Sequence, residues 1–66
     1  MSDDVMENPL WDVLVGVVHS HPLYLGHKAY TRDVILANQP EISCEALARR
    51  LDMPLGEAMV ILSELR

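Results

Sequence analysis

The stretch ISCEALARRLDMPLGEAMVILSELR, residues 42–66, predicts two short helices joined by a tight turn. Ser43 is a good N-cap for the first helix, and Glu45 in its first turn is favourably placed against the helix dipole. Residues 52–54 (DMP) provide the turn, and a last helix is expected from about Leu55 to the end of the stretch. Apolar residues at i, i+4 and i+7 should form its buried edge, with Ile61 beside them: Ala58, Leu62 and Leu65.

A hydrophobic helix is predicted near the N-terminus, after a flexible acidic leader over residues 1–7. Asn8 is a suitable N-cap and Pro9 suits the first helical position, so this helix should cover about residues 9–20. Its apolar residues occupy most of the circumference, and such a helix is either enclosed in a core or buried against another chain. Because 66 residues offer few ways to enclose it, we expect homodimerisation through Trp11, Leu14, Val15 and Val18.

A further helix is expected over about residues 27–38, since Pro40 disfavours a helical Gln39. Its inward residues should be Tyr30 and Val34, with either Leu36 or Ala37. The sequence therefore predicts an all-α fold in a single domain, residues 8–66. This domain would combine the N-terminal hydrophobic helix with a tri-helical core and would have no β-wing.

Residues 33–65 (DVILANQPEISCEALARRLDMPLGEAMVILSEL) resemble the tri-helical half of the winged-helix and helix-turn-helix superfamily. The matching elements are a helix ending in ILANQP, then EALARRL, then DMP leading to GEAMVILSEL. The pattern requires a small residue at Ala48, where the two helices of the motif cross, and uses Met53 to plug the turn. Domains of this superfamily bind DNA, RNA or proteins, so the resemblance implies a fold more than a function.

The outward face of the last helix is unusual for such a module. A recognition helix normally offers basic or amide side chains to base edges and phosphates, whereas this helix offers Glu57, Glu64 and several apolar residues. Apolar patches usually mark protein contacts, so we expect a protein partner, in a process that could be transcription-associated, to dock on Leu55, Met59, Val60 and Ser63. If these groups were buried and arginines lined the outer ridge, nucleic acid would be the preferred partner.

DNA binding is the alternative that the charge pattern leaves open. The net charge is −5, and residues 1–27 hold four acids and no Lys or Arg, which gives little long-range attraction to a polyanion. Residues 28–66 hold five bases and six acids. A dimeric DNA-binding regulator would contact phosphates through Lys28, Arg32, Arg49 and Arg50.

The remaining reactive residues predict no chemistry. The histidines His19, His21 and His27 fit no common zinc spacing and are expected to cap helices or lie in interfaces. Cys44 is expected to be a small half-buried residue. No phosphate loop, nucleophile elbow or spaced carboxylate pair is present, so we expect no enzyme, cofactor, metal or small-molecule substrate.

The sequence also predicts a soluble cytoplasmic protein. A single cysteine permits no internal disulfide. The N-terminal segment is acidic where a secretory signal would be basic. The longest apolar stretch, residues 10–18, is interrupted by Asp12 and is too short to span a bilayer.

Overall fold

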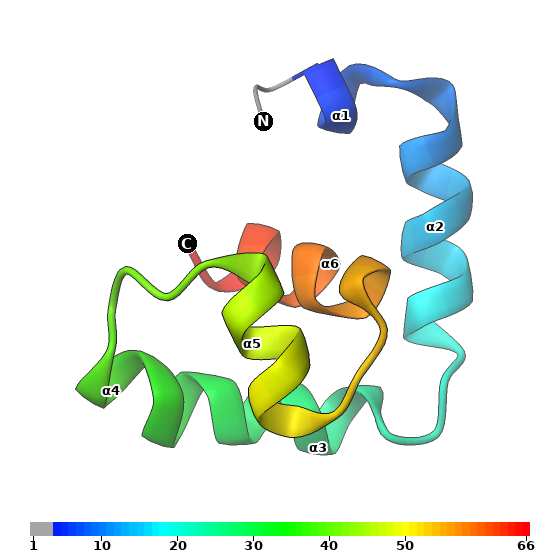
Figure 1. Ribbon diagram of the computed structural model, residues 1–66. Helices are drawn as coiled ribbons and strands as arrows, with labels where there is room; N and C mark the ends of the chain where they lie inside the picture. The colour runs from blue at the N-terminus through cyan, green and yellow to red at the C-terminus, as the bar shows by residue number, and fades with distance from the viewer. Residues whose placement is uncertain (1–3) are drawn as a thin grey trace.

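The computed structural model describes residues 4–66, which are all-α, with no strand in this range (Figure 1). The predicted fold class is therefore confirmed. The helical segments in chain order are α1 (Asp4–Glu7), α2 (Pro9–His19), α3 (Tyr24–Tyr30), η1 (Thr31–Ile35), α4 (Leu36–Asn38), α5 (Cys44–Leu51) and α6 (Leu55–Leu65). The single turn of α1 lies within the predicted leader, whose first three residues are outside the described part. Within residues 4–66, no helix is long and apolar enough to cross a bilayer.

Two helices begin at the predicted caps. The side chain of Asn8 accepts a hydrogen bond from the backbone N–H of Leu10 at 2.8 Å, and Pro9 occupies the first turn of α2. The Ser43 hydroxyl oxygen accepts from the backbone N–H of Ala46 at 3.1 Å at the start of α5. Each cap satisfies a backbone donor that a helix start would otherwise leave without a partner.

The turn between α5 and α6 closes with a left-handed residue. Asp52 has φ 55° and ψ 50°, a conformation that aspartate tolerates better than most residues. This geometry lets the backbone N–H of Met53 donate to the carbonyl oxygen of Ala48 at 2.9 Å. The Met53 side chain is buried beneath the turn, as the sequence predicted.

The segments α3, η1 and α4 form one continuous helix with a π-helical turn in its middle. In the wide turn, the backbone N–H of Leu36 donates to the carbonyl oxygen of Thr31, five residues earlier. The fully buried hydroxyl of Thr31 donates to the carbonyl oxygen of His27 at 2.7 Å. This helix begins at Tyr24, three residues before the predicted start.

The predicted inward face of this helix is wrong by about a quarter of a turn at Tyr30 and Val34, whereas Leu36 is half-buried against the core and Ala37 is exposed. Tyr30 and Val34 are 47% and 36% exposed, whereas Tyr24, Thr31 and Ile35 are buried. The buried residues follow i, i+7 and i+11 from the earlier start at Tyr24. Their spacing is as helical as that of the predicted set, so the sequence pattern alone did not separate the two faces.

Helix α6 is the centre of the core, with α5 on one side and α2 on another (Figure 1). Its predicted buried residues Ala58, Leu62 and Ile61 are buried, and Leu65 is half-buried. The other buried apolar residues surround it: Val18, Tyr24, Ile35, Ile42, Leu47 and Met53. Val60 is also fully buried, and α2, which is not part of the helix-turn-helix pattern, packs against α6.

A pair of glycine substitutions should show how closely α2 approaches α6. A Cβ added at Gly16, in the middle of α2, would meet no atom within 4 Å, so Gly16→Ala should stabilise the domain by about 0.5–1 kcal/mol through helix propensity. Gly56→Ala should gain less, because its new Cβ would lie 3.0 Å from Leu14 Cδ1. Urea unfolding measures both. Equal gains would contradict the packing of Leu14 on Gly56.

Candidate functional site

The four residues predicted to dock a partner on α6 do not share an exposed surface. Val60 is fully buried and Met59 is half-buried, so only Leu55, at 46% exposure, offers a substantial apolar side chain to solvent. The Ser63 hydroxyl donates to the carbonyl oxygen of Val60 at 2.7 Å. The expectation that Val60 and Glu57 face outward is wrong, because both are buried. Helix α2 packs against α6, and His27 of α3 pairs with Glu57.

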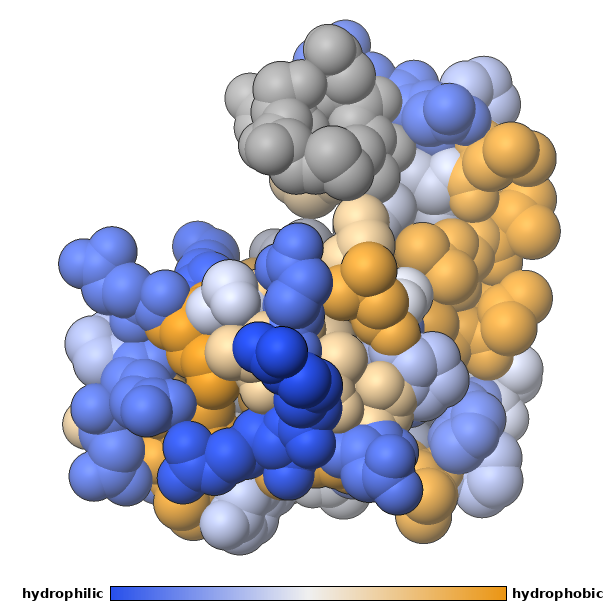
Figure 2. Space-filling view, viewed as in Figure 1, coloured by the Kyte–Doolittle hydropathy of each residue, from blue (hydrophilic) through white to orange (hydrophobic). Residues whose placement is uncertain are grey.

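The residues predicted for self-association on α2 face the core instead. Val18 is buried, and the other three are half-buried and packed against the core: Trp11, Leu14 and Val15. The outward side of α2 carries Leu10, Val13 and Val17, which are 70%, 61% and 62% exposed. We call these three residues the α2 ridge. Figure 2 shows the hydrophobic surface that covers the outer side of α2.

A small groove lies beside the ridge, between α2 and the start of α6. It has a volume of about 140 Å³, and its walls include Leu14, Val17 and Val18 from one side and Pro54 and Gly56 from the other. The missing side chain at Gly56 allows Leu14 to lie directly over the backbone of α6. We call this hollow the α2–α6 groove. Val17 belongs to both features, so ridge and groove form one continuous apolar surface.

A polar cluster around Glu64 ties α2 and α3 to the end of α6. The Tyr24 hydroxyl donates to the Glu64 carboxylate, His19 Nε2 lies 2.6 Å from it, and Lys28 Nζ lies 3.2 Å from it. Burial acts to raise the pKa of Glu64, but the hydrogen bonds from Tyr24, His19 and Lys28 outweigh burial and hold this pKa below its ordinary value. The cluster therefore favours a charged carboxylate.

The Tyr24 phenol and the Lys28 amine of this cluster are both shifted away from activation. Burial, and then the hydrogen bond to Glu64, raise the pKa of Tyr24. Hydrogen bonds to Tyr24 and Glu64 raise the pKa of Lys28. Both groups are thus held in their protonated forms, whereas a catalytic phenol or amine would need the opposite shift. The geometry is that of a structural clamp.

The lowered pKa of Glu64 predicts that the domain loses stability in acid. Because the folded-state pKa of Glu64 lies below its unfolded value, its contribution is present above the ordinary glutamate pKa and is lost as pH falls through the lowered value. Melting temperatures measured from neutral pH down to about pH 3 should therefore fall less steeply for Glu64→Gln than for the unchanged chain. Parallel curves would show that Glu64 is not held in this way.

A second carboxylate on α6 is almost enclosed. Glu57 is 3% exposed, and its Oε2 lies 2.5 Å from Nδ1 of His27. Among the described residues, His27 is the side chain that pairs with this carboxylate. A buried carboxylate needs such a partner, because removal from water disfavours its charge. This pair was not predicted from the sequence, since the two residues lie thirty positions apart and nothing in their spacing links them.

The histidines make contacts within the fold, and only His21 lies at a helix start as a capping role would require. His19 and His27 pair with glutamates, and His21 Nδ1 accepts a hydrogen bond from the backbone N–H of Leu23 at 3.1 Å. Over residues 4–66, no group of three His, Cys, Asp or Glu side chains could hold a metal ion. Cys44 is a half-buried free thiol.

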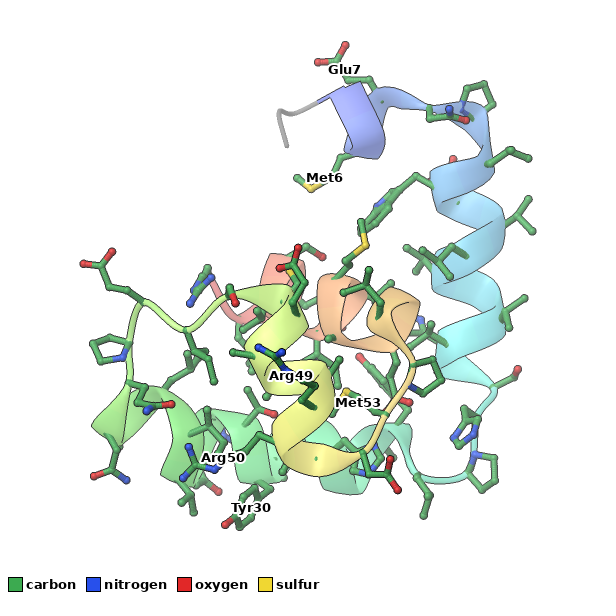
Figure 3. All side chains as sticks on the ribbon, in the orientation of Figure 1. Met6, Glu7, Tyr30, Arg49, Arg50 and Met53 are labelled. Carbon is green, nitrogen blue, oxygen red and sulfur yellow. The ribbon has the colours of Figure 1, made fainter. Side chains whose placement is uncertain are left out.

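Of the four basic residues predicted to contact DNA, two are held in ion pairs and two are exposed on α5. Lys28 is held in the Glu64 cluster, and Arg32 pairs with the neighbouring Asp33 at 2.9 Å. Arg49 and Arg50 are both exposed on α5 (Figure 3), where Arg50 donates to the Gln39 side chain at 3.2 Å. Arg32, Arg49 and Arg50 are therefore the exposed bases of this set, and α6 itself contains none.

Searches with the sequence and with the structure return no matching protein family, no similar curated protein and no similar solved structure.

Proposed function

We propose that this domain acts through protein–protein contacts made by the α2 ridge and the adjoining α2–α6 groove. The observation that carries the proposal is the exposure of Leu10, Val13 and Val17, each above 60% and all on one side of one helix. Single exposed apolar residues are common on soluble proteins, but a contiguous apolar ridge beside an apolar groove is typical of a docking surface. An exposed helix side of this kind suits the helix-in-groove mode of recognition.

The opposite side of α2 supports this proposal. Val18 is buried in the core, Leu14 lies against Gly56, and His19 is paired with Glu64. These contacts fix the helix from within, so the ridge is presented on an ordered element. A partner would then bind without a large entropic cost of ordering the helix. A cytoplasmic location, inferred from the single cysteine and the acidic N-terminal segment, and a transcription-associated role are part of the same proposal.

Photo-crosslinking in living cells tests the docking surface. A photoreactive amino acid at Val13 on the ridge should give covalent adducts with protein. The matched control places it at Glu41, which is exposed on the connection before α5. Adducts from Val13 alone would support the proposal. Equal yields from both sites, or none from either, would contradict it.

DNA binding remains a second candidate because Arg32, Arg49 and Arg50 are exposed. The resemblance to helix-turn-helix domains would place α6 in the groove of DNA, but α6 lies in the core and carries two paired glutamates. A DNA complex would thus have to use α5. If it forms, duplex affinity should fall steeply with salt and Arg49→Ala should weaken it. No duplex binding at low salt would remove this candidate.

A further inference from the structure

We infer that the partner of the α2 ridge is a second copy of this chain, packed antiparallel across a two-fold axis. This inference rests on the proposed function, since it names the occupant of the same surface.

The surface formed by the α2 ridge and the α2–α6 groove is complementary to itself. Each copy carries a ridge with a groove directly beside it, and Val17 belongs to both. A two-fold axis makes each contact occur twice, with the same patch used by both subunits. Two copies related in this way can each place a ridge in the groove of the other, whereas a flat apolar patch would give no such match.

The charges on this surface are compatible with the pairing of two copies. The ridge has no charged residue, and the carboxylate of Glu57 at the groove is already paired with His27. Burial of an unpaired charge is the main electrostatic cost of docking, and the pairing of two such surfaces buries none that is new. The antiparallel arrangement also sets the helix dipoles of the two α2 helices in opposite directions.

The apolar area available limits the strength of this dimer. The exposed parts of the three ridge side chains would bury roughly 100–250 Å² of apolar surface per copy in a dimer, from the usual relation between buried area and transfer free energy. The smallest specific interfaces need about 500 Å² per copy. The groove walls, together with exposed Pro54 and Leu55, must therefore take part. The resulting dimer is weak and depends on concentration.

Salt should strengthen this dimer. Each copy has a net charge of −5, so two copies repel one another at long range while their contact surfaces are apolar. Screening reduces the repulsion and leaves the apolar contact in place. A DNA complex would respond to salt in the opposite direction.

Sedimentation equilibrium of the whole chain tests the inference, from about 10 μM to about 1 mM protein and at low and high NaCl. The average mass should rise from 7.4 kDa towards twice that value, and further at high salt. Val13→Asp should weaken association at least about tenfold. The control is Leu25→Asp, which removes a side chain that is 74% exposed but lies outside the ridge; it should leave association unchanged. Circular dichroism establishes that both variants are folded.

Three results would overturn the inference: a 7.4 kDa species at every concentration, an unchanged mass for Val13→Asp, or an equal loss for Leu25→Asp. Crosslinking from Val13 between two differently tagged copies separates this inference from the proposed function. Adducts between the tagged copies support both. Adducts with another protein alone overturn the second-copy inference and keep the docking surface, and no adducts at all overturn both.

Discussion

Val60→Asp is expected to leave the chain unfolded at 25 °C, whereas Val13→Asp should leave it folded. The two substitutions make the same chemical change within a helix, but Val60 is fully buried and Val13 is 61% exposed. A carboxylate at position 60 would lie among apolar side chains with no partner, which costs several kcal/mol. A domain of 66 residues has only about 3–10 kcal/mol of stability in total. At position 13 the carboxylate would remain hydrated.

Far-UV circular dichroism and urea unfolding measure this difference. Alanine substitutions provide a milder version of the same comparison: Val60→Ala should lose about 1–3 kcal/mol through the cavity it creates, and Val13→Ala should change stability little. If Val60→Asp and Val13→Asp were equally well folded, Val60 would face solvent, as a helix-turn-helix arrangement of α6 requires.

His27→Ala should be the second most damaging of the substitutions considered. It would leave the Glu57 carboxylate, 3% exposed, without its imidazole partner. Loss of one member of a buried pair leaves an uncompensated charge, and because His27 is itself 21% exposed, water can relieve part of the cost. We expect a loss of about 2–3 kcal/mol in the free energy of unfolding.

A double-mutant cycle tests whether the pair, rather than His27 alone, is responsible. The double variant His27→Leu with Glu57→Leu should be more stable than His27→Leu alone, because it removes both polar groups together. His21→Ala is the matched control, since His21 is exposed and accepts only a backbone hydrogen bond; its loss should stay below about 1 kcal/mol. A cost for His21→Ala equal to that for His27→Ala would show that Glu57 needs no partner.

The features that sequence predicts well here are those fixed by local chemistry. Asn8 and Ser43 cap their helices because a short side-chain oxygen can reach a nearby backbone N–H in that geometry. Met53 lies beneath the turn because the chain reverses there within three residues. Helix α2 begins at Pro9 because proline suits the first helical position, and α6 begins at Leu55, directly after Pro54.

The orientation of each helix was harder to predict, for a physical reason. Helix α2 has apolar residues on most sides, so periodicity does not say whether Leu14 or Val13 faces the core. The answer depends on the close approach of Leu14 to Gly56, which lies forty-two positions later in the chain. The resemblance to a helix-turn-helix module added a second error, because it assigned an exposed face to α6.

The conditions under which nucleic acid would have become the preferred partner are only half met. Glu57 and Val60 are buried, but no arginine replaces them on the outside of α6. Arg66, which follows this helix directly, donates to the carbonyl oxygens of Pro40 and Ile42. Its guanidinium group therefore secures the connection before α5.

The contact between Leu14 and Gly56 should limit which pairs of residues are tolerated at positions 14 and 56 during evolution. In any orthologue, a larger residue at position 56 should be accompanied by a shorter one at position 14, so the two positions should covary. Leu10, Val13 and Val17 are under no such internal constraint. Persistent apolar character at these three positions across species would then reflect selection by a binding partner, and free drift to polar residues would indicate its absence.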